Sequence, residues 1–484
     1  MSENVIITPT INGIQRPVTS VWFSNSWMSA VNIASSAGVE LVSDTISESE
    51  AGDLDGDGYP DVYVSNYSDT IPNRILWNNR DNTFTVASIP GDIALSRMAK
   101  IGDVNGDGRP DIVVANNGAN SLWLNQGGRS FTAGSLPSSS SLDSDQVHLG
   151  NLFGNGRLDI YFTTQRVQYI DQQNELLRND GGGSFTVQNM TGDFYVTEGA
   201  AIGDLDGDGD LDILTRQDGD QMLAWYNDGS GNFTSPPSKL YGHVPFNGNR
   251  SYIVDMNQDN IPDFIELANY RLQYYRQNAD GTYTLFINIW DMGCYPGEIQ
   301  FGDANGDGLQ DMYLRGTREW ADKRSVLLVN TGLVDADGFP IMERGFSIIH
   351  PGFNNTGMAI ADFDQDGKTD WFQPSGNNGE ANYLWLIGKN ADDASLSVSS
   401  GSVPADGVTT STITVRAKLS GVDITHGGFN VVLYASGTAV ISGIVDNGDG
   451  TYTATISNNR PEVVTISGVI HGYNMSETAS VSFD

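Results

Sequence analysis

The chain has 484 residues, which is enough for two or three domains with a large hydrophobic core. It carries 60 acidic residues against 25 basic ones, a formal net charge of −35, so we expect neither nucleic acid nor an anionic membrane as a partner. The single cysteine, Cys294, excludes an internal disulfide framework, and no apolar run of about 18 residues is present that could insert into a membrane.

Residues 1–45 form an N-terminal segment with two short strand patterns, Val21–Asn25 and Gly38–Val42. The first residues lack both the basic start and the apolar core of a signal peptide, so no such signal is recognisable. From residue 46 the sequence becomes repetitive, and the role of both strand patterns depends on the repeat.

An oxygen-bearing group occupies every second position of the segment Asp53–Asp61, and Gly58 allows a tight bend within it. Ca²⁺ in proteins takes about six to eight oxygen ligands at roughly 2.3–2.6 Å. The sequence therefore predicts a calcium loop. The ligands that we predict are the side chains of Asp53, Asp55, Asp57 and Asp61 and the backbone carbonyl of Tyr59.

The same pattern recurs five more times, so the chain contains six intact loops and we expect one Ca²⁺ in each of them, six ions in all. The further predicted ligands, with the residue that offers its carbonyl named last in each set, are Asp103, Asn105, Asp107, Asp111 and Arg109; Asp204, Asp206, Asp208, Asp212 and Asp210; Asp255, Asn257, Asp259, Asp263 and Ile261; Asp303, Asn305, Asp307, Asp311 and Leu309; Asp362, Asp364, Asp366, Asp370 and Lys368.

A further copy at Asn151–Asp159 has lost most of these ligands. Phe153 stands where the second oxygen belongs, and Asp159 is the one remaining carboxylate. We expect this loop to bind no metal or to bind it weakly.

An EF-hand is the main alternative for loops of this pattern, but it requires a bidentate Glu at position 12 and a helix on each side. Position 12 carries such a residue in one loop only, at Glu266. Short apolar or β-branched runs such as Val62–Val64 follow the loops and are typical of strands. A metal-free acidic turn is the other alternative. It would explain a single loop of this pattern better than six copies at the same position of a repeat.

The loops begin at residues 53, 103, 151, 204, 255, 303 and 362, which gives a period of about 50 residues. Each period holds about four short strands, for example Arg74–Asn78 and Phe84–Val86, which is the content of one propeller blade. No amphipathic helix is evident in residues 46–390.

These repeats resemble the FG-GAP/VCBS family, as in the β-propeller of integrin α subunits, over about residues 46–390. The resemblance implies an all-β fold with seven blades, in which each calcium loop joins the first and second strands of its blade. It does not specify function, because the family includes adhesion receptors, lectins and domains attached to polysaccharide-degrading enzymes.

The seventh blade has only two strand patterns after Asp370, so its outer strand must come from elsewhere. Gly38–Val42 could supply it and join the two ends of the ring. The alternative is an eighth, degenerate blade built from residues 1–45, because Val21–Asn25 resembles the third strand of the repeats. We favour seven blades.

From Asp393 the composition shifts to Ser, Thr, Val and Gly, with alternating strand patterns such as Thr412–Val415 and Tyr452–Ile456. The segments Pro404–Gly407 and Asp446–Tyr452 resemble the bacterial immunoglobulin-like domains of invasin and intimin, and this resemblance implies a β-sandwich. We read Asp446–Tyr452 as a hairpin turn rather than as a metal site. The predicted domains are therefore an N-terminal segment (1–45), a propeller (46–391) and a sandwich (392–484).

No catalytic constellation is recognisable, so we expect no enzyme. The five histidines, at positions 148, 243, 350, 426 and 471, have no metal-ligand spacing, and no nucleophile elbow is present. The densest basic cluster, Arg318–Arg324, fits a solvated loop.

Aromatic and polar residues gather in the loops expected on the face opposite the calcium loops, and such a mixture suits a glycan. The alternative is that most of these aromatic rings pack between blades. The candidate ligand-binding residues are Tyr195, Tyr241, His243, Tyr270, Arg271, Trp290, Tyr295, Arg318 and Trp320.

The sequence thus predicts a calcium-dependent, secreted or surface-associated bacterial binding protein, a lectin or adhesin that recognises a glycan or glycoprotein on a cell surface. Asp/Asn calcium loops suit the high calcium outside cells. A protein-binding adhesin, a receptor-binding tip of a larger particle and a polysaccharide-degrading enzyme are the alternatives.

Overall fold

The computed structural model forms two compact units, Met1–Trp27 with Ala34–Leu384 and Met28–Ile33 with Trp385–Asp484. The residues that the structure describes are 10–11, 14–15, 30–32, 46–137, 143–164, 173–190, 197–217, 221–234, 238–241, 248–268, 271–278, 281–287, 296–316, 324–335, 339–349, 357–374, 382–387, 393–419, 422–423, 431–447, 450–470 and 473–484. Among these residues every regular element is a strand, and no helix is long and apolar enough to cross a membrane.

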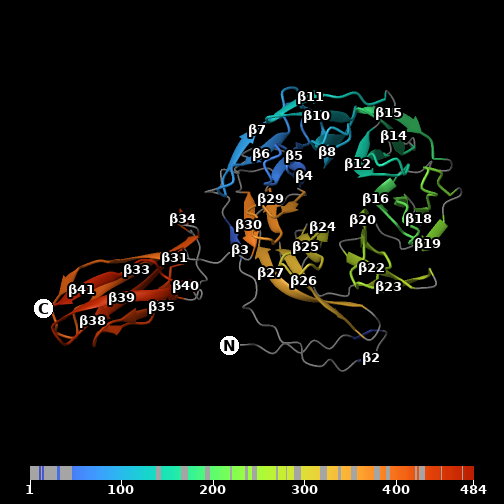
Figure 1. Cartoon of the computed structure of the whole chain (residues 1–484). Coiled ribbons are helices and arrows are strands. Elements are labelled where there is room, and N and C mark those ends of the chain that lie inside the picture. Colours follow the sequence, from blue (N-terminus) through green and yellow to red (C-terminus); the bar gives the residue numbers. More distant parts are fainter. Residues whose placement is uncertain are drawn as a thin grey trace. The chain divides into compact units, whose positions relative to one another are not determined.

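Six four-stranded antiparallel sheets follow one another along the chain, and we number them as blades 1 to 6 (Figure 1). Blade 1 contains β4 (Ile46–Gly52), β5 (Asp61–Asn66), β6 (Arg74–Asn78) and β7 (Phe84–Ala87); blade 2 contains β8 (Ser96–Gly102), β9 (Asp111–Asn116), β10 (Ser121–Gly127) and β11 (Ser130–Ala133); blade 3 contains β12 (Ser144–Gly150), β13 (Asp159–Thr164), β14 (Glu175–Gly181) and β15 (Ser184–Gln188). Blade 4 contains β16 (Thr197–Gly203), β17 (Asp212–Gln217), β18 (Gln221–Trp225) and β19 (Ser238–Tyr241); blade 5 contains β20 (Gly248–Val254), β21 (Asp263–Ala268), β22 (Arg271–Gln277) and β23 (Tyr283–Ile287); blade 6 contains β24 (Pro296–Gly302), β25 (Asp311–Gly316), β26 (Arg324–Val334) and β27 (Pro340–Ile349).

The seventh sheet combines strands from distant parts of the chain. It contains β28 (Ala359–Ala361), β29 (Asp370–Gln373), β30 (Tyr383–Ile387) and, outermost, β3 (Ala30–Asn32), which pairs antiparallel with β30. The N-terminal segment thus supplies the missing strand, but with residues 30–32 in place of the expected 38–42, because Val31 comes into register with Leu386.

The other N-terminal strands, β1 (Thr10–Ile11) and β2 (Ile14–Gln15), pair only with each other. The described residues therefore contain seven propeller blades. Both segments weighed at the sequence level, Val21–Asn25 and Gly38–Val42, lie outside these residues.

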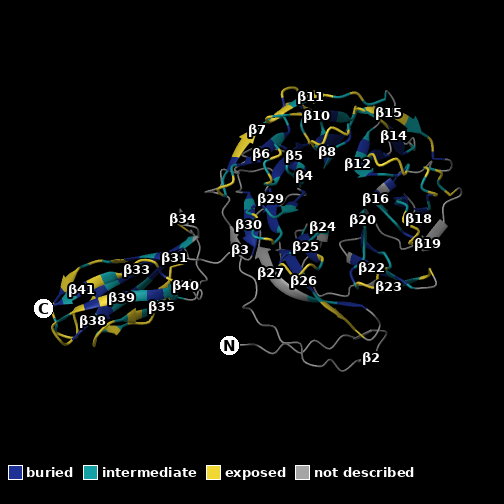
Figure 2. Cartoon of the chain, viewed as in Figure 1, coloured by how far each residue is buried: buried dark blue, intermediate teal, exposed yellow. Residues whose placement is uncertain are grey.

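The seven sheets form a closed ring, in which the innermost strand of each blade approaches the next blade and β28 returns to β4 (Figure 1). The second strands β5, β9, β13 and β17 are buried along their whole length (Figure 2). Adjacent blades pack closely at the end of the inner strands. A Cβ atom added at Gly52 would lie 2.9 Å from Cγ2 of Ile101 in blade 2, so the absence of a side chain lets the isoleucine fit.

Buried ion pairs also link inner strands across the ring. Arg250 Nη2 of β20 lies 2.5 Å from Glu48 Oε2 of β4. Glu298 of β24 lies within 3.9 Å of Arg250 and accepts a hydrogen bond from Arg315 Nε at 3.1 Å. The two acids and two arginines thus balance one another's charge away from water.

The C-terminal unit contains two sheets that form the immunoglobulin-like sandwich. One sheet contains β31 (Asp393–Val398), β33 (Ser411–Leu419), β34 (Val422–Asp423), β36 (Val440–Ile441), β37 (Val445–Asp446) and β38 (Thr451–Ser457). The other contains β32 (Ser402–Val403), β35 (Val431–Ala435), β39 (Glu462–Ile470), β40 (Tyr473–Asn474) and β41 (Ala479–Phe483). Strands β37 and β38 pair antiparallel on either side of the Asp446–Tyr452 turn, as a hairpin requires.

Candidate metal sites

Each acidic loop joins the first and second strands of its blade, as the sequence predicts. We number the loops by blade: loop 1 (53–61), loop 2 (103–111), loop 3 (151–159), loop 4 (204–212), loop 5 (255–263), loop 6 (303–311) and loop 7 (362–370). Loop 1 bends twice through left-handed backbone, at Gly56 (φ 76°) and Gly58 (φ 92°). Loop 5 makes the same bends without glycine, at Gln258 (φ 60°) and Asn260 (φ 61°).

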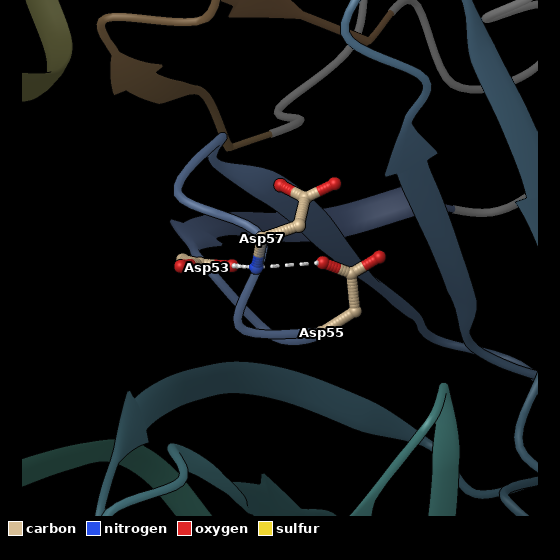
Figure 3. A group of neighbouring side chains, drawn as sticks. All are labelled: Asp53, Asp55 and Asp57. Carbon is tan, nitrogen blue, oxygen red and sulfur yellow. Dashed lines mark hydrogen bonds between the residues drawn. The ribbon is translucent and has the colours of Figure 1, made fainter.

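The first ligand position organises each loop through backbone hydrogen bonds. Asp53 Oδ1 accepts from Gly56 N at 2.9 Å and from Asp57 N at 3.0 Å, and its Oδ2 accepts from Gly58 N at 2.9 Å. Asp57 N also donates to Asp55 Oδ1 at 3.2 Å, so the carboxylates of Asp53 and Asp55 both point at this amide, and ligand atoms of all three aspartates lie within 4.8 Å of one another (Figure 3). The loop conformation therefore aims several carboxylates at the same space.

Three loops bring ligand atoms of three carboxylates within 4.8 Å of one another. The groups are Asp53, Asp55 and Asp57 in loop 1; Asp204, Asp206 and Asp212 in loop 4; and Asp362, Asp364 and Asp370 in loop 7. In loops 2, 5 and 6 an asparagine replaces one of these carboxylates, and no such trio of acids occurs there among the described residues. An amide oxygen remains a ligand for Ca²⁺.

The ninth position of every loop is a buried aspartate at the start of the second strand. In loop 1, Asp61 accepts hydrogen bonds from Leu54 N at 3.0 Å and from Asn78 N at 2.8 Å, so it ties the loop to the third strand. Burial raises the pKa of Asp61, Asp263 and Asp311 to about 7 and that of Asp111 and Asp212 to about 6. A cation beside these carboxylates would favour their charged form.

The six intact loops fit Ca²⁺. Their donors are all oxygens, which is the set that this hard cation prefers. Within loop 5, Asp255 Oδ1 is buried and accepts no hydrogen bond from the described residues, and a bound cation would compensate it. The side chains at positions 1, 3, 5 and 9 and the carbonyl at position 7 would hold the ion, which would neutralise the carboxylates and fix the loop.

Loop 3 does not fit a metal ion. Phe153 packs against a hydrophobic cluster that contains Tyr161 and Trp225, and its ring fills the space beside Gly231 of blade 4. Asp159 is the one carboxylate left in this ligand set, and its two oxygens accept backbone hydrogen bonds from Leu152, Phe153 and Asn179, as those of Asp111 do in loop 2. An aromatic contact between blades 3 and 4 therefore occupies the place where the second oxygen ligand would stand.

Arginines approach the ligands of loops 1 and 2. Arg80 Nε lies 2.6 Å from Asp57, and Arg129 Nε of blade 2 lies 2.8 Å from Asp55 and stacks on Trp77. In loop 2, Arg109 pairs with Asp107 at 2.5 Å. Guanidinium groups thus compensate part of the negative charge of these two loops.

Sequence reasoning missed an asparagine that lies on the third strand of blades 1, 2, 3 and 6 and just after it in blade 4. Asn125 Nδ2 donates to Leu54 O of loop 1 at 2.7 Å and to Pro110 O at 2.9 Å. The same kind of hydrogen bond links four other loops to the following blade. The donors are the side-chain amides of Asn179, to loop 2, Asn227, to loop 3, and Asn330, to loop 5, and Asn78 donates to Phe363 O of loop 7. The repetition of this asparagine at one position of the period was the available signal.

The candidate ligand-binding residues of the opposite face lie outside the part of the chain whose side chains the structure describes. Tyr241 ends β19 and Arg271 begins β22, and only their backbones are described. The other seven candidates fall outside the described residues, so the ligand-binding set stays a prediction.

A family model described as FG-GAP-like repeat matches residues 53–99, 103–162, 151–215, 204–266 and 255–314, which together exceed half of the chain. The chain belongs to the FG-GAP-like repeat family. Its C-terminal unit matches the model of invasin domain 3 over residues 390–484. No curated protein matched the sequence.

Two solved structures are similar to this FG-GAP protein. The BP39L lectin from Burkholderia pseudomallei aligns with a TM-score of 0.53 at 13% identity, over 71% of this chain and 96% of the lectin. A lectin from Agrocybe aegerita, described as recognising non-reducing terminal N-acetylglucosamine, aligns with a TM-score of 0.45 at 20% identity, over 65% of this chain and 83% of that chain. The first similarity supports the fold alone.

Proposed function

We propose that this FG-GAP protein is a calcium-dependent extracellular bacterial binding protein, a lectin or adhesin that recognises glycans or glycoproteins on a cell surface. The observation that carries the proposal is the presence in one chain of an FG-GAP ring, whose acidic loops include three trios of carboxylates that could hold a metal ion, and of an invasin domain 3. The fold shared with the BP39L lectin supports a carbohydrate as the ligand.

In this proposal Ca²⁺ has a structural role. One ion in each intact loop would hold the turn between the first and second strands, and the ring would then present its opposite face rigidly. Such loops match calcium concentrations outside cells, which supports a secreted or surface-associated location. Residues 392–484 would act as a spacer or attachment module for the propeller of residues 46–391.

A glycan array probed with the whole chain in 2 mM calcium (roughly the extracellular range in which such sites fill) and again in excess EGTA tests the proposal. We expect reproducible glycan signals in calcium that disappear in EGTA. Absence of any glycan signal, together with binding to a proteinaceous receptor, would favour the protein-binding adhesin. Turnover of a polyuronide would favour the enzyme.

A further inference from the structure

Tyr67 lies on the face of the ring opposite the acidic loops, at the junction of blades 1 and 2. It follows the end of β5, whose beginning adjoins loop 1, and forms an antiparallel bridge with Leu95 just before β8. The residue is 41% exposed, and Ile93, two positions before Leu95, is 47% exposed. An aromatic ring with a fixed backbone thus lies at the surface.

Two polar chains hold this ring, and each extends across three consecutive blades. In the first, the Arg97 guanidinium of blade 2 lies over the Tyr67 ring, 5.7 Å from its centroid, and Nη1 donates to Asp145 Oδ1 of blade 3 at 3.4 Å. The cation is therefore positioned from both sides, and it supports one face of the phenol ring.

The second chain runs through Asn117 of blade 2. With its amide oriented to satisfy both neighbours, Asn117 accepts a hydrogen bond from Tyr67 Oη at 2.8 Å and donates to the two carboxylate oxygens of Asp143 at 3.0 and 3.2 Å. A phenol, an amide and a carboxylate consequently form one row beside the aromatic ring.

This arrangement matches the chemistry of a pyranose ring. A sugar offers an apolar face of C–H groups, which stacks on an aromatic ring, and a rim of hydroxyls, which bind amides and carboxylates. Because the Tyr67 ring and its partners are already fixed, binding would order fewer protein side chains and would cost less conformational entropy. The net charge of −35 and the engagement of Arg97 by Asp145 disfavour an anionic sugar.

We propose that Tyr67, Asn117 and Asp143 form a subsite for a neutral pyranose, with Arg97 as the positioning residue behind the ring. This inference rests on the proposed function, since it assigns part of a glycan site to named residues. The subsite lies opposite the acidic loops, so the sugar contacts these side chains and not a metal ion.

Isothermal titration of the whole chain in calcium with methyl glucoside, methyl galactoside, methyl mannoside and methyl N-acetylglucosaminide identifies the best monosaccharide probe. The 6-carboxylate form of that sugar is the matched charged probe. We expect the neutral sugar to bind at least tenfold more tightly than its uronate. Tyr67→Ala should weaken binding at least tenfold or remove one site from the stoichiometry, whereas Tyr67→Phe, which keeps the ring, should lose only a few-fold.

Tyr434→Ala is the control, because Tyr434 is 55% exposed in the sandwich, and we expect it to bind as the unaltered chain does. Equal melting temperatures of all variants exclude unfolding as the cause. If the unaltered chain binds neutral sugars and Tyr67→Ala binds them equally, the subsite is refuted and the proposed function stands. If no sugar binds the unaltered chain, on the array or in titration, both fall.

Discussion

An asparagine on or just after the third strand couples five of the seven acidic loops, loops 1, 2, 3, 5 and 7, to the following blade. In blade 2 the amide of Asn125 satisfies two carbonyls, one in its own blade and one in loop 1. A buried carbonyl that loses its donor costs about 1–3 kcal/mol. A single short side chain therefore contributes to two blades at once.

Replacing Asn125 by Ala should lower the free energy of unfolding by about 2–4 kcal/mol, because two buried carbonyls lose their donor. Gln126→Ala is the matched control, since this exposed neighbour bonds only to Leu124 O, and we expect a change below about 0.5 kcal/mol. Denaturant unfolding in saturating calcium measures both. Equal effects of the two substitutions would contradict the coupling role.

His148 lies on the inner strand β12, near the positive charges of Lys100 and Arg250. Burial lowers its pKa to about 3, and the positive charges of Lys100 and Arg250 add to the effect. Between pH 6.5 and 3 the unfolded chain binds a proton that the folded chain does not, so stability falls as the pH falls.

We expect the unaltered chain to lose about 1–2 kcal/mol more than His148→Gln between pH 7.5 and 5. The difference between the two proteins isolates this histidine from the carboxylates that titrate in both. Denaturant unfolding at each pH provides the measurement, and parallel pH profiles would show that His148 is protonated in the folded state.

At the scale of the element, loop 3 shows that the turn between the first and second strands can be stabilised in two ways. Six loops gather oxygen atoms, whereas loop 3 inserts Phe153 against Gly231 of the next blade. The backbone hydrogen bonds of Asp159 persist in this loop, so the strand connection is kept without the ligand set.

Phe153→Ala should therefore destabilise the protein by about 1–3 kcal/mol to the same extent with and without calcium, because it removes packing and no ligand. Asp206→Ala in loop 4 is the comparison, since it removes one oxygen ligand of a metal-compatible trio. It should lower the melting temperature in calcium and leave the melting temperature in EGTA nearly unchanged. A calcium-dependent effect of Phe153→Ala would indicate that loop 3 holds an ion.

The position of the loops and of most strands could be predicted from sequence, because both depend on neighbours within about ten residues. The absence of an intact ligand set in loop 3 was also visible. The packing of Phe153 against blade 4 and the reach of Asn125 into loop 1 depend on contacts between separate repeats, which a single sequence does not reveal. The outer strand of the seventh blade, residues 30–32 in place of the expected 38–42, could not be predicted for the same reason, because it pairs with a distant part of the chain.

At the scale of the whole molecule, the two units differ in their expected response to calcium. All six intact loops lie in the ring, and the described residues of the sandwich contain no comparable group of acids. Each site that calcium fills at about 100 times its Kd adds about 2.7 kcal/mol to the folded state.

Calorimetry of the whole chain should consequently show one transition that shifts down by at least 10 °C when EGTA replaces calcium (on the order of several sites' contribution) and a second that stays in place. The insensitive transition serves as the internal control for the chelator. An unchanged pair of transitions would refute calcium stabilisation of the ring.

The pairing of β3 with β30 sets an order of events during synthesis. Ala30–Asn32 leaves the ribosome early but has no strand to join until Tyr383–Ile387 has been made, and Asn78 likewise waits for the carbonyl of Phe363. Blades 1 to 6 have all their strands before the seventh blade is complete. A nascent chain arrested before residue 383 therefore contains β28 and β29 but lacks β30, so Ala30–Asn32 has no partner and the seventh blade has no outer half.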